Sequence, residues 1–541
     1  MSWVVFIPPL LVFLVGIFFH RIILALIVGI CASALIVTHG APIDSVSLIG
    51  RRFYETFDLN LLFSSGSFWD CDHILIMLFP FIIGIVIEMI HRSGGARALI
   101  LKASSSIRCK RGVETSSLLL SHCLFIDDYL SCLTVGSVLR PLADKHLVPR
   151  AKLAFLVDIM AASLAILCPV SAWAAAIIGF LSDNGIGESI EETIYVMAPP
   201  NVIYLRTLPY VFYSFTVIVT VWFIVRRKIS FGLMRSHEKI ADEKGHLFGP
   251  RKKGRNAEAT VTDSKEPAYI MDFIVPIATL LVSVFIGLLY WGEHRLFGGD
   301  RSFVAALQNA SAAIVLFVGS SISFIVSVIY YLLSGRFSYR KMPKIILKGS
   351  LDVLPVVAIL ACSWTFGALL REDVQTGSYL ANIIGDSLPL YLLPCIFFVV
   401  ALATAISIGT TWGTAAILFP IAIPLVVSLS HVATPATPDQ MAMLFPVLGA
   451  ILAGGVCGCN TSVIADTTIL SSASSSCHHF DHFNTQWRYV LPMAIGSVVA
   501  FAITGLLVER SMILSIVVPL IASISISLLI VSALHMATSK K

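Results

Sequence analysis

Charged residues are scarce in this sequence. Only 13% of the 541 residues are Asp, Glu, Lys or Arg, whereas 57% are hydrophobic. A soluble globular domain usually has about 25% charged residues, so the composition excludes an ordinary soluble protein. A membrane span needs about 20 apolar residues. The sequence predicts an all-α polytopic membrane protein because apolar runs of this order occur at 3–19, 22–37, 73–90, 201–225, 270–292, 304–333, 489–508 and 512–533.

Other absences exclude further classes. The N-terminal stretch MSWVVFIPPLLVFLVGIFF has no basic residue before its apolar run, which favours a retained helix over a cleaved signal peptide. The eleven cysteines are an odd number and lie mostly in apolar runs, so no disulfide framework is predicted. The basic residues behind the net charge of +5 lie in inter-helix loops, which indicates a lipid bilayer rather than nucleic acid as the partner.

No resident metal or cofactor is predicted. The pair Cys457 and Cys459 has no second cysteine pair to complete a metal site. The His-rich stretch CHHFDHF (477–483) fits no standard zinc spacing. We interpret that stretch as a cytoplasmic turn.

The loop charges predict a topology. Lys and Arg collect in cytoplasmic loops, and 226–265 has eleven of them while 334–350 has five and no acid. The segment 226–269 is therefore expected to be a flexible cytoplasmic linker. By contrast, 181–200 has four acids and no base, and 38–72 has five acids against two arginines. These two segments are expected outside.

The stretch LFIDDYLSCLTVGS places Asp127 and Asp128 side by side in an apolar segment. The flanking segments 91–112 and 140–152 are both basic and are both expected in the cytoplasm. The region 113–139 then has to enter the membrane and return as a re-entrant hairpin. Irregular backbone at that depth is tolerated only beside water or inside protein.

The chain contains a weak internal repeat. RSGGARALILKAS (92–104) aligns with QTGSYLANIIGDS (375–387), and 124–144 aligns with 407–427. The loop charges invert the second copy, which predicts a second hairpin over 388–430. Eleven crossings and two hairpins place the N-terminus outside and the C-terminus in the cytoplasm. Inverted repeats with broken helices are typical of secondary transporters, whose sites lie near the membrane midplane.

The predicted organisation has six parts. These are an N-terminal helical hairpin and outside loop (1–72), a first repeat (73–225) with hairpin 113–139, a basic cytoplasmic linker (226–269), connecting scaffold helices (270–350), a second repeat (351–510) with hairpin 388–430, and a C-terminal helix and tail (511–541).

A long polar helix follows each hairpin. The first, 152–181, is broken at Pro169, and the second, 449–476, is rich in Gly, Ser and Thr. Cations bind carboxylates, hydroxyls and carbonyls that are freed where a helix unwinds. The predicted ion- or substrate-binding residues are Asp127, Asp128, Asp158, Thr410, Thr411, Asp466, Thr467 and Thr468.

Each carboxylate also has a structural interpretation. Neighbouring residues on a helix point about 100° apart, so Asp127 and Asp128 are expected to differ in role. One of them could cap a half-helix N-terminus or pair with Arg140 or Lys145. Asp158 could form an ion pair with Lys152, about two turns away.

These segments resemble a known family. FIDDYLSCLTVGSVLRPLADKHLVPRAKLAFLVD, SIGTTWGTAAILFPIAIP and IADTTILSSASSSCHHFDHFNTQWRYVLP are similar to the NhaC-type sodium/proton antiporter family of the ion transporter superfamily. The resemblance covers about 92–175 and 400–492. It implies a non-enzymatic exchanger of the bacterial inner membrane with inverted repeats, two re-entrant hairpins, an elevator-like movement and a homodimer. Related carriers exchange sodium or protons with organic acids such as malate and lactate.

The chain departs from the family pattern at three places. DDYANTL is replaced by DDYLSCL, with Ser131 and Cys132, and VDSTAAP is replaced by VDIMAAS over 157–163. The usual GDHCSPISDTT becomes GCNTSVIADTT, so Cys459 and Asn460 stand where the family has an acid and a histidine. The second break therefore has fewer titratable ligands than the family pattern.

The leading hypothesis is a secondary antiporter that exchanges sodium, or another monovalent cation, for protons. A sodium- or proton-coupled carrier of organic anions is the alternative. An intramembrane aspartyl protease needs two aspartates that face each other from separate helices. Asp127 and Asp128 are chain neighbours, although Asp127 and Asp158 could in principle meet. The internal repeat and the second polar break have no role in such a protease.

Overall fold

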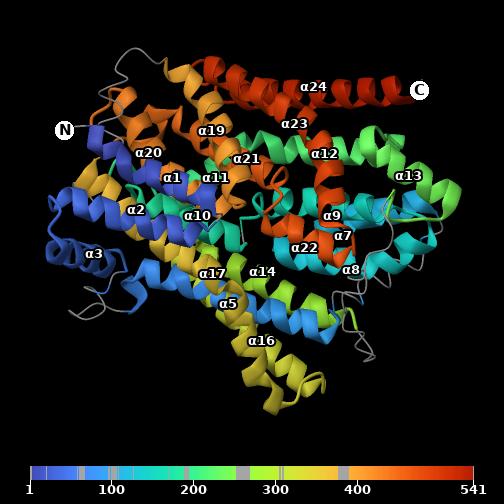
Figure 1. Ribbon diagram of the computed structural model, residues 1–541. Helices are drawn as coiled ribbons and strands as arrows, with labels where there is room; N and C mark the ends of the chain where they lie inside the picture. Colours follow the sequence, from blue (N-terminus) through green and yellow to red (C-terminus); the bar gives the residue numbers. More distant parts are fainter. Residues whose placement is uncertain are drawn as a thin grey trace.

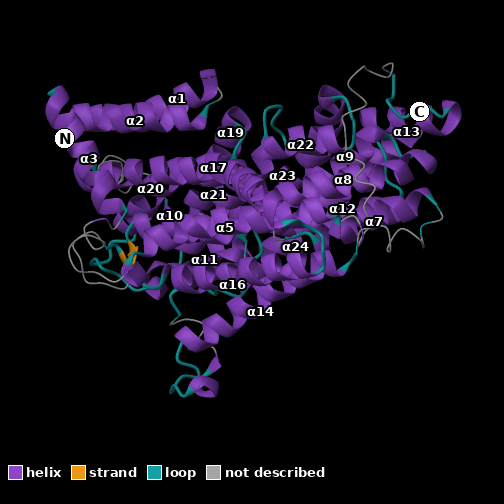
Figure 2. Ribbon diagram, turned by 90° about the horizontal axis from the view of Figure 1, so that it is seen from below, coloured by secondary structure: helices purple, strands orange, loops and turns teal. Residues whose placement is uncertain are grey.

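The protein consists almost entirely of α-helices (Figures 1 and 2). The computed structural model describes residues 3–19, 21–57, 59, 68–95, 98, 107, 109–125, 127–169, 171–187, 194–250, 269–303, 306, 310–375 and 389–539. The first half contains α1 (Ile7–Phe19), α2 (Ile22–Val37), α3 (Pro42–Thr56), α5 (Asp72–Ser93), α7 (Lys110–Cys123), α8 (Asp128–Lys145), α9 (Arg150–Ala165), α10 (Ala172–Asp183), α11 (Pro200–Thr207), α12 (Phe212–Arg227) and α13 (Gly232–Lys244). The second half contains α14 (Met271–Trp291), α16 (Ala312–Leu333), α17 (Met342–Ala368), α19 (Leu393–Ile408), α20 (Thr411–Leu429), α21 (Leu444–Cys459), α22 (Asp466–Ser474), α23 (His479–Leu507) and α24 (Leu514–Ser539). Two short parallel strands, β1 (Ile186–Gly187) and β2 (Val196–Met197), pair beside α10.

The helices confirm a polytopic membrane protein. Within the described part of the chain, seven helices are long and apolar enough to cross a membrane, or up to ten if each bent helix pair is one span. The α2–α3 pair is bent by 119°, and the pair Pro200–Tyr210 and Phe212–Lys244 by 44°. The chain thus has broken helices, and this count of spans is smaller than the eleven crossings expected from the loop charges.

Broken helices follow the same order in both halves. In the first half, α7 and α8 are separated at 124–127, and α9 and α10 at 166–171. In the second half, α19 and α20 are separated at 409–410, and α21 and α22 at 460–465. All four breaks lie at or beside positions where the sequence has polar residues, Gly or Pro within an apolar run.

The breaks of the two halves meet because α22 packs on α8 and α9. Figure 1 shows α22, in orange, beside the cyan helices α8 and α9. The helix before this break, α21, is buried along its whole length and lies against α19. The centre of the molecule therefore joins elements that are more than 300 residues apart in sequence.

Two segments differ from the expectation of unstructured loops. Part of the expected outside loop forms α3, an amphipathic helix with Ser45 and Leu48 buried on one face. Part of the expected flexible linker forms α13, whose Met234, His237 and Ala241 are buried. This helix packs against α9 and α23, so tertiary contacts hold a segment that its polarity alone marks as a linker. Residues 251–268 of that linker, and most of the repeated segments 92–104 and 375–387, lie outside the described residues.

Candidate functional site

A small polar cavity lies where three helix breaks meet. Its free volume is about 20 Å³, and about 10–15 Å³ is enough for one water molecule. It is lined by the beginnings of α8, α20 and α22 together with side chains of α9, α10 and α21. The lining residues are Asp128, Tyr129, Ala162, Trp173, Gly409, Thr410, Thr411, Trp412, Cys459, Ala465, Asp466 and Thr467.

Two carboxylates from different halves face this cavity. Asp128 lies in the first turn of α8 and is 5% exposed. Asp466 lies in the first turn of α22 and accepts a hydrogen bond of 2.9 Å from the Tyr129 hydroxyl. Carboxylates in the first turn of a helix are stabilised by the positive end of the helix dipole. The break geometry thus tolerates two acids at one place in an apolar protein.

Hydroxyl groups complete the cavity wall. Gly409 adopts φ of +74°, a left-handed conformation that suits glycine and ends α19. Thr410 then caps α20 by accepting a hydrogen bond from the Gly413 amide, 3.5 Å away. The Thr411 hydroxyl lies 3.1 Å from the Cys459 thiol. The Thr467 hydroxyl is buried, and no hydrogen-bond partner for it occurs among the residues that the structure describes.

Asp158 lies in a second polar cluster rather than in the cavity wall. Its side chain is fully buried, and its Oδ2 accepts hydrogen bonds from Thr468 at 3.0 Å and from the Gln486 amide at 2.5 Å. His482 Nε2 lies 3.7 Å from the same oxygen. In the described part of the chain, Oδ1 of Asp158 has no hydrogen-bond partner. The structure therefore divides the predicted residues between two adjacent sites.

Three other charged residues that the sequence singled out, Asp127, Lys152 and Arg140, lie outside the cavity wall. Asp127 directly precedes α8 and is half-buried, but it does not line the cavity. Lys152 pairs with Glu114 at 2.8 Å and also with Glu238, so the expected ion pair with Asp158 is replaced by this one. Arg140 donates a hydrogen bond of 2.7 Å to Ser476.

Sequence reasoning missed His482 and Gln486. The stretch 477–483 is not a simple turn, because α23 begins at His479 and buries His482 completely. His482 bonds Ser472 through Nδ1 and Gln486 through Nε2, each at 2.8 Å. The signal was present, since His482 and Gln486 are four residues apart and lie on one helix face. The polar composition of CHHFDHF favoured a turn, so the sequence did not predict a buried helix face there.

Carboxylate and hydroxyl oxygens are the ligands that hard cations prefer. The cavity offers both kinds, and its volume suits a species of the size of a water molecule. In the part of the chain that the structure describes, no group of three or more His, Cys, Asp or Glu side chains could hold a metal ion. The cavity therefore offers oxygen ligands around a space of the size of a water molecule.

Comparisons with known proteins give the family. The Na+/H+ antiporter family model matches residues 164–506. An uncharacterized protein of Haemophilus influenzae is 29% identical over 501 residues, which are 92% of this chain and 90% of that protein.

Two solved transporters are similar in structure. MtrF of Neisseria gonorrhoeae, described as one of a class of antimetabolite efflux pumps, has a TM-score of 0.52 and 14% identity, with 81% of this chain and 85% of that chain covered. The YdaH transporter of Alcanivorax borkumensis, described as having an unusual topology, has a TM-score of 0.48 and 16% identity, with 79% and 84% covered. At 14% identity, the likeness to MtrF is one of fold alone. The family model matches more than half of the residues of this chain. The chain therefore belongs to the Na+/H+ antiporter family and is a multi-pass membrane transporter.

Proposed function

We propose that this protein exchanges sodium, or another monovalent cation, for protons at the cavity between α8, α20 and α22. The observation that carries the proposal is the meeting of Asp128 and Asp466 with three threonine hydroxyls around a space of about 20 Å³. A dehydrated monovalent cation needs several oxygen ligands at short range. The cavity supplies them from both halves of the chain.

Coupling follows from competition for the carboxylates. When Asp128 and Asp466 are ionised, they attract a cation, and when they are protonated that attraction is lost. Bound cation and bound protons then exclude each other, so one is carried inward as the other moves outward. Asp158 on α9 accepts a hydrogen bond from Thr468, the residue that follows the cavity-lining Thr467 in α22. With Gln486 and His482 also beside it, Asp158 forms the second ionisable centre of the proposed pathway.

The expected architecture supports alternating access. The repeated order of broken helices in the two halves fits two inverted repeats with re-entrant hairpins at 113–139 and 388–430. We propose that α7–α10 and α19–α22 form a moving transport domain and that the protein is a homodimer. The basic segments 226–269 and 334–350 support a cytoplasmic C-terminus and an outside N-terminus.

A carrier of organic anions such as malate or lactate is the second candidate. The beginnings of α8, α20 and α22 converge at the cavity, and helix N-termini attract carboxylates. The cavity has a volume of about 20 Å³. This volume holds a water-sized species and is too small for an acid of three or four carbons. Organic-anion transport would therefore require a wider state of the site.

Proteoliposomes with a preset proton gradient test the two candidates. Sodium, lithium, potassium, malate and lactate are added separately to vesicles containing the full chain. We expect sodium or another cation alone to dissipate the gradient, and Asp466→Asn to abolish this response. Asp352→Asn is the matched control, because this carboxylate is exposed on α17. A response to organic acids without any response to cations would overturn the proposal and favour the second candidate.

A further inference from the structure

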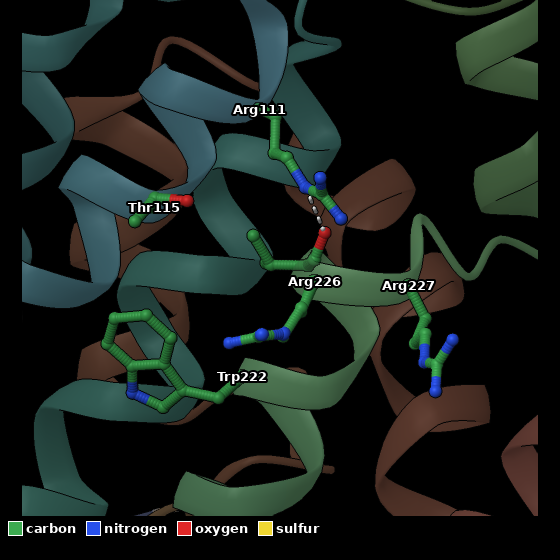
Figure 3. A pocket seen from close by; sticks show the side chains of 6 residues that line it. Arg111, Thr115, Trp222, Arg226 and Arg227 are labelled. Carbon is green, nitrogen blue, oxygen red and sulfur yellow. Dashed lines mark hydrogen bonds between the residues drawn. The ribbon is translucent and has the colours of Figure 1, made fainter.

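A second, larger cavity lies away from the ion site, between α7 and α12. Its volume is about 590 Å³, and it is lined by Arg111, Thr115, Trp222, Val225, Arg226 and Arg227. Figure 3 shows Arg226 extending between Thr115 and Trp222, with Arg111 above it. The Arg111 and Arg226 side chains thus flank one space, whereas the side chain of Arg227, which also lines the cavity, extends away from Thr115 and Trp222 in this view.

Among the residues that the structure describes, no acid pairs with these guanidiniums. None of the lining residues is acidic, and in the described part of the chain no carboxylate forms an ion pair with the three arginines. The neighbouring acids are engaged elsewhere, because Glu114 pairs with Lys152 at 2.8 Å and Asp242 pairs with Lys110 at 3.0 Å. Arg111 itself donates only a long hydrogen bond of 3.4 Å to the Val225 carbonyl. The cavity is thus a positively charged site for which the described residues provide no counter-ion.

The guanidinium group matches phosphate in geometry, because its planar fork can donate two hydrogen bonds to two oxygens. The Thr115 hydroxyl adds a neutral donor at the same cavity. These groups together favour a phosphate monoanion or diester over a simple halide.

The surfaces next to the arginines are apolar. On α7, Leu119 lies about two turns beyond Arg111, rotated by about 80° around the helix axis, and is 52% exposed. On α12, Val219 lies two turns before Arg226 and is 40% exposed. Two helical turns span about 11 Å, so cationic groups and exposed apolar groups follow each other along both helices. This pattern matches an amphipathic ligand, with its phosphate at the arginines and its chains along α7 and α12.

The position of Trp222 agrees with a lipid. Tryptophan is enriched at the membrane–water interface, where its ring is partly apolar and its N–H is polar. Trp222 lines the cavity between the arginines and the apolar surface, and its ring centroid lies 5.9 Å from that of His122. A phospholipid with its headgroup in this cavity would have its phosphate at the interface.

We propose that the cavity between α7 and α12 binds the headgroup of an anionic phospholipid. Arg111 and Arg226 bind the phosphate, and the surfaces around Leu119 and Val219 contact the acyl chains. Because α7 belongs to the broken helix that leads to Asp128, the lipid would touch the same element that builds the ion site. The proposal stands independently of which ion is transported.

Native mass spectrometry of the full chain in detergent tests the proposal. The protein is titrated with phosphatidylglycerol, with phosphatidylethanolamine of the same acyl chains, and with inorganic phosphate. We expect phosphatidylglycerol to bind preferentially and its binding to weaken at least about tenfold in the double variant Arg111→Gln/Arg226→Gln, as for the loss of two charge-assisted contacts. Arg340→Gln, at an exposed arginine outside the cavity, is the matched control and should retain wild-type binding.

Three outcomes would overturn the lipid assignment. They are equal binding of the zwitterionic lipid, unchanged binding in the double variant, and displacement of phosphatidylglycerol by equimolar inorganic phosphate, which would indicate a soluble ligand. Arg226→Lys preserves the positive charge and is a control for misfolding of the double variant. We expect it to keep binding within about threefold, because an ammonium retains the attraction but loses the fork geometry.

Discussion

Tyr129 donates its hydroxyl to Asp466 across 2.9 Å, although 337 residues separate the two in sequence. The contact joins the first turn of α8 to the first turn of α22 at the wall of the small cavity. A cation in that cavity would compete with the tyrosine for the same carboxylate. The hydroxyl therefore helps to set the balance between the ionised and the protonated forms of Asp466.

Replacing Tyr129 with Phe removes this donor and keeps the ring. A hydrogen bond to a charged group contributes about 1.5–3 kcal/mol, and losing it favours the protonated carboxylate. We expect the pH of half-maximal exchange to rise by about one unit, which corresponds to about 1.4 kcal/mol. The measurement is the pH profile of sodium-induced proton efflux from proteoliposomes. Tyr339→Phe, at a ring that is 69% exposed, is the control, and an unchanged profile for Tyr129→Phe would contradict the role assigned to the hydroxyl.

Cys459 gives a second test of the ion site, because its thiol is a neutral group in the wall that also contains Asp128 and Asp466. The thiol lines the cavity and lies 3.1 Å from the Thr411 hydroxyl. Cys459→Asp adds a third carboxylate to the wall, and a negative charge at contact distance strengthens cation binding by several kcal/mol even at an intermediate dielectric constant. We expect the apparent affinity for sodium at alkaline pH to rise about tenfold or more, which is about 1.4 kcal/mol.

The neutral variant Cys459→Asn separates charge from size. It should leave the apparent affinity near that of the wild type, because it adds polar atoms without charge. Equal effects of the Asp and Asn variants would mean that Cys459 acts through packing rather than through the electrostatics of the cavity.

The positions of the helix breaks could be predicted from the sequence. That three of the breaks line one cavity could not be predicted. Asp128 and Asp466 are polar residues in apolar surroundings, and Gly409 precedes the paired threonines, so local composition marks each break. Whether a marked residue faces the cavity depends on helix rotation and tertiary packing. This is why Asp127 and Asp158 lie outside the cavity wall while Tyr129, which carries no charge at neutral pH, lies within it.

In two segments, polar composition predicted a turn or a linker where the structure has a packed helix. His482 lies in a stretch as polar as any loop, yet α23 buries it against Ser472 and Gln486. The basic segment after α12 has the composition of a linker, yet Glu238 of α13 pairs with the buried Lys152 of α9. In both segments a polar partner compensates the burial: a neighbouring side chain for His482, and Lys152 of a distant helix for Glu238. Composition alone does not reveal such a partner.

Lys152 holds α7, α9 and α13 together. Its ammonium pairs with Glu114 at 2.8 Å and with Glu238, while the lysine is only 4% exposed. Removing one partner of a buried ion pair costs about 3–5 kcal/mol, because the remaining charge stays buried. We expect Lys152→Met to destabilise the protein by about this amount, measured by thermal unfolding in detergent.

Two comparisons make this prediction specific. Lys239→Met removes a lysine whose side chain is 71% exposed and should change stability by less than about 1 kcal/mol. The triple variant Lys152→Met/Glu114→Gln/Glu238→Gln removes all three charges and should recover much of the loss. If the triple variant is as unstable as the single variant, packing rather than charge explains the effect.

Gly458 controls how closely α21 approaches α19, and hence where the second break lies. A Cβ atom at this position would lie 2.5 Å from the Cβ of Ala405 and 2.7 Å from the Leu402 carbonyl oxygen. An alanine would normally favour the helix by about 1 kcal/mol, so any loss of stability reflects the steric conflict. Because the conflict pushes α21 away from α19, Cys459 moves relative to Thr411 and the cavity changes shape.

We therefore expect Gly458→Ala to destabilise the protein by about 1–3 kcal/mol, as for an overpacked core, and to weaken sodium-induced exchange as well. Gly50→Ala in α3 is the matched control, because a Cβ there meets no atom within 4 Å. That variant should be neutral or slightly stabilising, with unchanged exchange. Thermal unfolding and proteoliposome exchange measured on both variants distinguish the outcomes. If Gly458→Ala is as stable as the Gly50 variant, the two helices can separate without cost, and the close contact does not position the second break.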